Sequence, residues 1–204
     1  KSQGGSNLVG FKLKTKYYAA RDYIMVEDFI TEDMIKDVQK KFGDEIDAVI
    51  MSAGASSGKM TLHRKEYDIN LYGVSSGYIR SSMTKVIAGR YISDKDCEQM
   101  RSTCVISDRQ AQKVFGSVRG AIGKSISVTV DGEMTDLTVV GVYEDQLSGI
   151  MSAMVNMTGE DWNGEIYMPY STFNRNMGMN DDTFYYFTLN TKTGVDATEF
   201  CDKV

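Results

Sequence analysis

Residues 89–145 read GRYISDKDCEQMRSTCVISDRQAQKVFGSVRGAIGKSISVTVDGEMTDLTVVGVYED, and this stretch carries a complete set of local folding signals. A β-rich run over residues 103–106 leads to Ser107, a good helix N-cap, and Gln110 completes a capping box. Gly116 is a natural helix stop. The stretch therefore predicts a strand followed by a short helix.

The second half of the same stretch predicts a hairpin. Apolar residues alternate with Ser and Thr over residues 125–130, Asp131-Gly132 supplies the turn, and residues 137–142 return. This alternation is typical of a strand with one buried face and one solvated face. The stretch predicts a folded unit and contains no catalytic motif.

Upstream of this unit, residues 31–43 predict the clearest helix in the chain. Thr31 can cap it, Met34, Ile35, Val38 and Phe42 give an apolar face, and Gly43 ends it. Residues 11–18 and 47–53 predict strands on either side. A Gly/Ser turn is expected at residues 54–58, and the further strands expected are 60–63 and 67–74.

The remaining segments are less regular. Residues 81–88 are weakly helical, and residues 146–164, rich in Met, Ser, Gly and Asn, predict a mobile loop. A short strand is expected at residues 165–169, with Ser171 capping a brief helix after it. Residues 183–191 predict a central strand, because both of its faces are apolar or aromatic. A helix is expected at residues 195–204, and the end of the chain interrupts it. We therefore interpret the sequence as a segment cut from a longer protein.

Composition excludes several classes of protein. The 204 residues carry a net charge of −5, which argues against nucleic-acid binding. No apolar run is long enough to span a membrane. Three Cys are too few for a disulfide framework; Cys97 and Cys104 could be bridged or could be two buried thiols. A single His makes a zinc site very improbable.

Short motifs that would indicate nucleotide binding, acid–base catalysis or cation binding match this sequence only weakly. The near-matches to a phosphate loop at residues 53–60 and 118–125 lack their first Gly, and β-alternation follows each where a helix would be needed. We interpret His63 as a sheet residue and acidic pairs such as Asp94 with Asp96, and Asp181 with Asp182, as surface loop features. The sequence predicts no catalytic residue, no metal ligand and no cofactor.

One cluster of methionines has a functional interpretation as well as a structural one. Met151, Met154 and Met157 have flexible thioether side chains that suit adaptable binding surfaces, although Met is also an ordinary core filler. Two interpretations stay open: part of a core or loop, or a contact surface. With Trp162 they are the candidate contacts for a partner or substrate.

Five motifs in order carry a family resemblance. They are Gly89-Arg-Tyr-Ile92 with Asp94 or Asp96 after it, Cys104 to Gly116, Ile122-Gly-Lys-Ser-Ile126, Leu137 to Val142, and Ile166-Tyr-Met-Pro-Tyr-Ser171. Over residues 78–170 the chain resembles the extracytoplasmic core domain of MacB-like ABC transporter permeases, in the FtsX-related superfamily. It departs from the family at residues 120–121, where Gly-Ala replaces Asn-Pro, and in the loop 146–164.

The resemblance implies an α+β fold with a split α/β Porter-like subdomain, residues 11–88 and 166–204, and an inserted β-rich Sabre-like subdomain, residues 89–165. It implies a domain at the cell membrane, on the extracytoplasmic side, that gates or relays motion for export of peptide, drug or lipoprotein substrates. It also implies a non-enzymatic domain, ATP hydrolysis by a separate cytoplasmic ATPase, and permeases that act as homodimers or heterodimers. The partners expected are that ATPase and a peptide or lipid substrate. Two alternatives are a stand-alone surface binding module and an FtsX-type regulator of cell-wall hydrolases.

Overall fold

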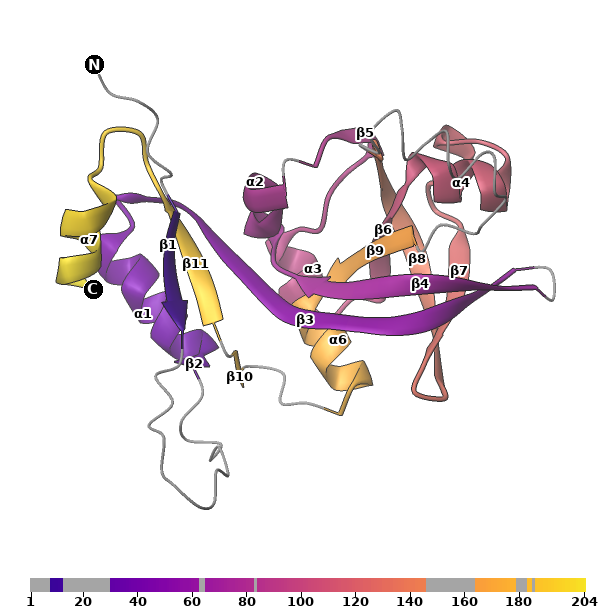
Figure 1. The fold of residues 1–204 in the computed structure, drawn as a ribbon, viewed down its shortest axis with the longest axis horizontal. Coiled ribbons are helices and arrows are strands. Elements are labelled where there is room, and N and C mark those ends of the chain that lie inside the picture. The colour runs from indigo at the N-terminus through magenta and orange to yellow at the C-terminus, as the bar shows by residue number, and fades with distance from the viewer. Residues whose placement is uncertain are drawn as a thin grey trace.

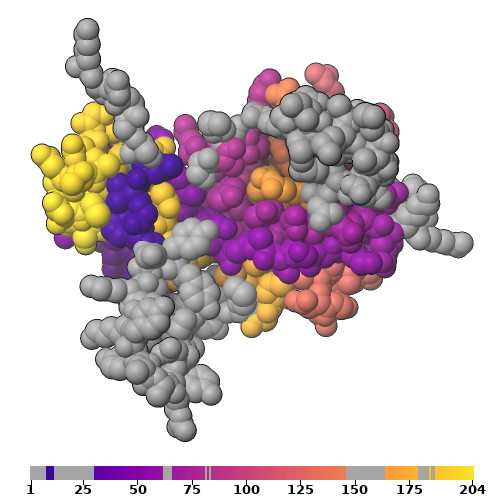
Figure 2. All heavy atoms as spheres, viewed as in Figure 1, coloured from indigo at the N-terminus to yellow at the C-terminus, as the bar shows by residue number. Residues whose placement is uncertain are grey.

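A computed structural model describes most of the chain. The described residues are 8–12, 30–62, 65–82, 84–145, 164–178, 183–184 and 186–204. They form two lobes that share one long strand, β3 (Figure 1). In the space-filling view the indigo N-terminal and yellow C-terminal segments lie side by side at one end of the molecule, and the middle of the chain forms the other end (Figure 2).

We call the smaller part the α/β lobe. Its elements are β1 (Leu8–Lys12), β2 (Ile30–Thr31), α1 (Glu32–Phe42), the first part of β3 (Ile46–Leu62), β10 (Thr183–Phe184), β11 (Tyr186–Thr191) and α7 (Ala197–Lys203). β11 lies between β1 and β3 and pairs antiparallel with both, as expected of a central strand. The rings of Phe42 on α1 and Phe200 on α7 meet edge to face at 5.6 Å, which joins the two helices of this lobe.

We call the larger part the barrel lobe. Its elements are the rest of β3, β4 (Lys65–Val74), η2 (Ser76–Tyr78), α2 (Ile79–Ser82), β5 (Val86–Gly89), α3 (Asp94–Glu98), β6 (Thr103–Ser107), α4 (Asp108–Phe115), η3 (Arg119–Ala121), β7 (Ser125–Val130), β8 (Glu133–Tyr143), β9 (Gly164–Pro169) and α6 (Tyr170–Asn176). Strand pairing closes into a ring in the order β3, β4, β9, β6, β8, β7 and back to β3, and β5 adds to β8.

Local signals in the sequence determine several of these elements. Thr31 accepts a hydrogen bond from the Met34 amide at the start of α1, and Ser107 with Gln110 forms a complete capping box at the start of α4. Gly116 ends α4 in the left-handed conformation. The β7–β8 hairpin turns at Asp131-Gly132 as predicted. One detail of α1 is wrong: Met34, expected on the apolar face, is 56% exposed.

The Gly/Ser turn predicted at residues 54–58 is wrong. These residues continue β3, which runs for 17 residues and pairs with β4 on one edge and with β7 on the other. A register shift against β4 lies between Ser52 and Gly54, where Gly54 has φ +123°, and another, against β11, lies between Ile46 and Ala48. Such a bulge bends a strand without ending it. Pairing with β4, which covers all of residues 54–58, therefore overrode the local preference of Gly and Ser for turns. The pairing with β7 lies further along, at residues 59–61.

Three further predictions need correction. Residues 86–89, expected at the end of a weak helix, form β5, and α2 covers only Ile79–Ser82. Ser171 lies inside α6 and does not cap it; its hydroxyl donates to the carbonyl of Cys97 at 2.6 Å. Residues 183–191 are split between β10, which pairs with β2, and β11.

Two buried hydrophobic clusters hold the molecule together. One fills the barrel lobe and includes residues of α4 and α6. The other is shared between the lobes: Ile35, Phe184 and Phe200 come from the α/β lobe, and Val74 and Tyr167 from the barrel lobe. The lobes therefore share apolar contacts as well as β3. Strands from both predicted ranges, 11–88 and 89–165, build the barrel, and the Porter and Sabre boundaries stay a prediction.

Candidate functional site: the cleft between the lobes

A cleft of about 360 Å³ lies where the two lobes meet. Its walls come from five elements: α1 and the start of β3 from the α/β lobe, and η2, α3 and the start of α6 at Tyr170 from the barrel lobe. Apolar side chains form the floor and are buried; they are Ile35, Val49, Met51, Cys97 and Tyr170. Charged side chains form the rim, and they are Glu32, Lys36, Asp47, Asp94 and Glu98. The cleft is thus apolar below and mainly acidic above.

Ion pairs order part of this rim. Lys36 pairs with Glu32 one helical turn away at 2.9 Å, and this hydrogen bond and the Glu32 charge raise the pKa of Lys36 above its ordinary value. Glu98 on the opposite wall also interacts electrostatically with Lys36. Arg80 reaches Asp47 at 4.0 Å. These ion pairs lie at the surface and contribute little to stability.

Tyr170 connects the two lobes at the bottom of the cleft. Its ring meets that of Phe184 on β10 edge to face at 5.1 Å, and its hydroxyl is hydrogen-bonded with Glu32 on α1. Burial, followed by the nearby charge of Glu32, raises the pKa of Tyr170 above its ordinary value. The phenol therefore stays neutral, and its buried ring and hydroxyl join α6 to β10 and α1.

A buried ion pair positions α3, one wall of the cleft. Ser93 and Asp96 form a capping box at the start of α3, and Asp96 also receives two hydrogen bonds from Arg90. The interpretation of Asp94 and Asp96 as a surface loop pair is therefore wrong for Asp96, whose side chain is fully buried. Burial alone would raise the pKa of Asp96, but hydrogen bonds from Arg90 and Ser93 outweigh it and lower the pKa to about 2.

Ser75 fastens the barrel lobe to the first part of β3. Its hydroxyl accepts a hydrogen bond from the Met51 amide at 2.9 Å and donates to the Val49 carbonyl at 3.2 Å, and its own amide donates to the Met51 carbonyl. Gly77 lies so close to β3 that a Cβ there would meet the Val49 carbonyl oxygen at 2.0 Å. The contact between the lobes at this point combines backbone groups with the Ser75 hydroxyl.

The two cysteines whose pairing the sequence left open are both free and buried, and Cys201 is free and exposed. Burial raises the pKa of Cys97 to about 12, and it also raises the pKa of Cys104. A thiol is an effective nucleophile only as a thiolate. Neither buried cysteine is therefore prepared for nucleophilic chemistry.

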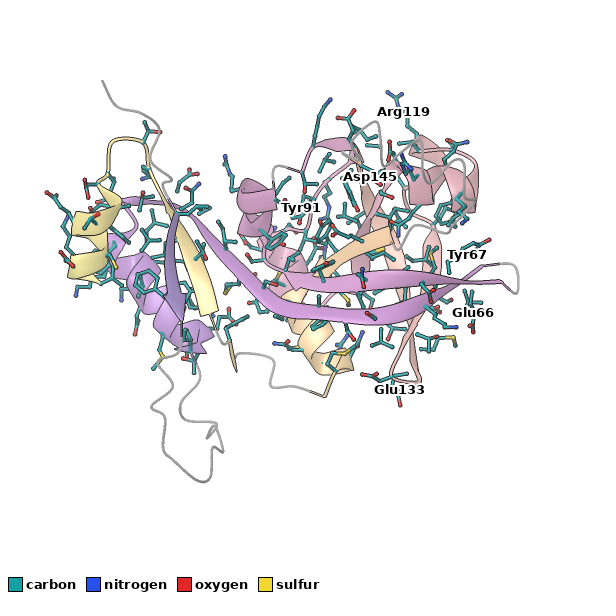
Figure 3. All side chains as sticks on the ribbon, in the orientation of Figure 1. Glu66, Tyr67, Tyr91, Arg119, Glu133 and Asp145 are labelled. Atoms are coloured by element: carbon teal, nitrogen blue, oxygen red, sulfur yellow. The ribbon has the colours of Figure 1, made fainter. Side chains whose placement is uncertain are left out.

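A group of tyrosines stiffens the barrel lobe behind the cleft. The rings of Tyr72, Tyr78, Tyr91 and Tyr143 lie 5.4 to 6.2 Å from that of Tyr167. The Tyr167 hydroxyl donates to Glu165 at 2.6 Å, and the Tyr143 hydroxyl donates to the Glu165 carbonyl at 3.1 Å. Figure 3 shows Tyr91 inside this lobe, beside α3 and β9. Burial raises the pKa of Tyr91, Tyr143 and Tyr167, which suits packing and not proton transfer.

The candidate contacts predicted from the sequence, Met151, Met154, Met157 and Trp162, lie outside the described residues, as do His63 and the pair Asp181 and Asp182. The two phosphate-loop near-matches lie at strands and turns: Lys59 is in β3, paired with Glu66 at 2.8 Å, and Lys124 precedes β7. Within the described ranges no group of three or more His, Cys, Asp or Glu comes together to hold a metal ion. In the same ranges no helix is both long and apolar enough to cross a membrane.

A family model described as the MacB-like periplasmic core domain matches residues 4–204. The chain belongs to this family. The match confirms the family that the order of motifs predicts, and the family is part of ABC transporter permeases. Such permeases work together with ATPase subunits.

Solved structures of the same fold agree with the family. The periplasmic region of MacB from Actinobacillus actinomycetemcomitans is similar with a TM-score of 0.60 and 21% identity, over 83% of this chain and 69% of that one. The extracellular domain of the ABC-type transporter YknZ from Gram-positive bacteria is similar with a TM-score of 0.59 and 23% identity, over 84% and 78%. A permease domain from Porphyromonas gingivalis is similar with a TM-score of 0.50 and 16% identity, over 80% of this chain and 71% of that one. No curated protein matches the chain. The first two are a periplasmic region and an extracellular domain of transporters, and the likeness confirms a mixed α/β fold.

Proposed function

We propose that this chain is the extracytoplasmic domain of an ABC transporter permease and that its two lobes change their relative orientation during transport. ATP would be hydrolysed by a separate cytoplasmic subunit or domain, and two permeases would act as a dimer. The substrates would be peptides, drugs or lipoproteins. The domain itself would perform no covalent chemistry.

The observation that carries the proposal is the way in which the lobes are joined. β3 is the continuous strand that they share, and it is bulged at Gly54, beside a cleft whose walls come from both lobes. Hinges are a few positions that absorb backbone rotation, and Gly allows conformations that other residues resist. A bulged strand next to an open cleft is an arrangement in which a small rotation opens or closes the gap.

A cross-link over the cleft tests the proposal. In the full-length permease, Lys36→Cys on α1 and Glu98→Cys on α3 would be joined by a short bismaleimide reagent, with Cys201→Ser because Cys201 is exposed. The matched control is Lys36→Cys with Lys40→Cys, which lie one turn apart on α1 and so within one lobe.

We expect the interlobe cross-link to reduce transport and transport-coupled ATP hydrolysis at least fivefold, while the control cross-link leaves both unchanged. Mass spectrometry of the protein would establish that both pairs are joined. Full transport by a permease that is completely cross-linked over the cleft would contradict the proposed motion.

A further inference from the structure

The barrel lobe consists of two half-barrels that come from different parts of the chain. The first half-barrel contains the barrel part of β3 together with β4, β9 and α6, drawn in purple and orange in Figure 1. The second half-barrel lies within residues 86–143 and contains β5, α3, β6, α4, β7 and β8. Strands of the two halves meet at two boundaries of the ring: β7 pairs with β3, and β6 pairs with β9.

The boundary between β6 and β9, which we call the seam, has very little strand pairing. Among the described residues its register contains a single pair, Val105 with Tyr167. On its other edge β9 pairs with β4 at six positions, and β7 pairs with β8 at six. A ladder of main-chain hydrogen bonds fixes the register of two strands. The seam therefore has less to hold its strands in one position than its neighbours have.

Side-chain hydroxyls hold the seam together instead. The Tyr143 hydroxyl at the end of β8 donates to the Glu165 carbonyl of β9 at 3.1 Å. Two hydroxyls of α6 donate to carbonyls of the second half-barrel at 2.6 and 3.0 Å: Ser171 to Cys97, and Thr172 to Arg101. A hydroxyl can rotate to follow its acceptor. Such bonds therefore tolerate a small displacement that would break a main-chain ladder.

Two buried polar groups at the seam lack a hydrogen-bond partner within the described part of the chain. They are Oη of Tyr91 and Nε2 of Gln110. The Tyr91 ring lies 6.2 Å from that of Tyr167 on β9, and a Cβ at Gly164, the first residue of β9, would meet Nε2 of Gln110 at 2.0 Å. Native structures pair nearly all buried polar groups. These two groups indicate that the halves fit together less completely here than in a ladder.

Packing prevents the two halves from separating. One hydrophobic cluster spans both: Met60, Ile69 and Ile166 come from the first half-barrel, and Ile106, Val128 and Leu137 from the second. β7 also pairs with β3 at three positions. Separation would expose this core to water, whereas a small sliding movement would not. Sliding of packed elements, or shear, is one of the ways in which proteins change conformation.

We propose that the two half-barrels slide against each other along the seam, and that the barrel lobe thus contains a second moving boundary. The hydroxyl-to-carbonyl bonds of Tyr143, Ser171 and Thr172 break one at a time and re-form after the displacement. This movement lies inside the barrel lobe. It does not depend on the rotation between lobes in the proposed function.

Amide hydrogen exchange of the 204-residue chain, followed by NMR, tests the seam residue by residue. Backbone groups of successive residues in a strand point to opposite edges. The Glu165 carbonyl bonds across the seam, so Glu165 and Tyr167 are expected to face β6, and Ile166 and Met168 to face β4. We expect the seam-facing amides to exchange at least tenfold faster than those facing β4, because the seam opens while the β4 ladder stays intact.

Two matched variants link this exchange to the bonds that hold the seam. Tyr143→Phe removes a hydroxyl that bonds to Glu165 across the seam, and Tyr72→Phe removes one that bonds to Glu165 at 3.4 Å within the first half-barrel. We expect Tyr143→Phe to accelerate exchange at Tyr167 several-fold relative to Met168, and Tyr72→Phe to leave that ratio unchanged. The ratio corrects for a general loss of stability, which would accelerate both amides.

NMR relaxation dispersion detects the sliding itself. We expect exchange on the microsecond-to-millisecond time scale at the amides of Val105 and Tyr167, and none at Val128 in the β7–β8 ladder. Three results would overturn the proposal: equal protection of both edges of β9, no dispersion at the seam, or equal effects of the two Tyr→Phe variants. None of these measurements involves the interlobe cross-link, so either proposal can fail while the other stands.

Discussion

Arg90 holds the buried carboxylate of Asp96 through two hydrogen bonds, from Nη1 to Oδ2 at 2.5 Å and from Nη2 to Oδ1 at 3.0 Å. The Asp96 side chain is fully buried, whereas the Arg90 side chain is 46% exposed, so the arginine stays in contact with solvent while it neutralises the acid. Arg101 adds a weaker contact at 3.6 Å. The pair fixes the segment after β5 to α3 and so determines where one wall of the cleft stands.

Replacing Asp96 should destabilise the fold. Asp96→Asn keeps the shape of the side chain but removes the charge that Arg90 and Ser93 are arranged to bind. We expect a loss of about 2–4 kcal/mol in the free energy of unfolding, because one partner of a buried ion pair is removed. Urea denaturation measures it. Glu98→Gln on the same helix is the control, with an expected change below about 0.5 kcal/mol. Equal effects of the two substitutions would contradict the role given to Asp96.

The same carboxylate predicts a pH dependence. The pKa of Asp96 is lowered to about 2 in the folded chain from 3.8, so the folded state binds the proton less readily than the unfolded state. Its contribution to stability, on the order of 2 kcal/mol, is present above pH ~4 and is lost as the pH falls towards 2. Urea denaturation at pH 6 and pH 3 should show a smaller decrease for Asp96→Asn than for the wild type. An equal decrease would exclude Asp96 as a source of acid sensitivity.

The bulge in β3 should tolerate only glycine. Gly54 has φ +123°, a conformation that L side chains rarely adopt, although there is open space around it. Gly54→Ala should therefore cost about 1–3 kcal/mol through backbone strain and not through a clash. The control is Gly10→Ala in β1, where the nearest atom to the added methyl group lies 4.0 Å away. Thermal unfolding of both variants measures the difference, and equal melting temperatures would count against strain at the bulge.

The hydroxyl of Ser75 should stabilise the contact between the two lobes. Ser75→Ala leaves the buried amide of Met51 without that hydrogen bond, at a cost of about 1–2 kcal/mol. Hydrogen exchange at the Met51 amide should accelerate. Ser57→Ala, on an exposed part of β3, is the control and should change little. Unaltered exchange at Met51 would show that the backbone contacts alone fasten the lobes.

Thiol reactivity should separate the three cysteines. Burial raises the pKa of Cys97 to about 12 and also raises that of Cys104, whereas Cys201 is exposed. An aromatic disulfide reagent should titrate one thiol per chain in the native protein and three in urea. Cys201→Ser should abolish the fast reaction. A second thiol reacting rapidly in the native state would mean that the shared core opens on the time scale of the assay.

Local signals in the sequence predicted much of the fold. The caps at Thr31 and Ser107, the stop at Gly116 and the turn at Asp131-Gly132 each depend on neighbours within a few residues, so the chain itself specifies them. The turn expected at residues 54–58 was wrong because pairing with residues 69–73 of β4 decides the conformation of that segment.

The candidate site was much less accessible to sequence analysis. Its rim joins Glu32 and Asp47 to Asp94 and Glu98, and only the folded chain brings these segments together. One signal was available: Ser93 followed three residues later by Asp96 fits a capping box, and it could have indicated that Asp96 is not an ordinary surface acid. The possible contact residues Met151, Met154, Met157 and Trp162, for which the sequence left two interpretations open, stay a prediction.

The length of β3 has a mechanical consequence. From the bulge near Gly54 to Leu62 the strand continues into the barrel lobe for about 25 Å, at roughly 3.3 Å per residue. Treated as a rigid lever arm, this section would swing its far end by about 4 Å for a tilt of roughly 10° at the bulge. A small angular change at the bulge would thus become a displacement of about 4 Å at the far end of the strand. In a membrane-anchored domain, this amplification would turn a slight rotation at the bulge into a larger movement of the far end of β3.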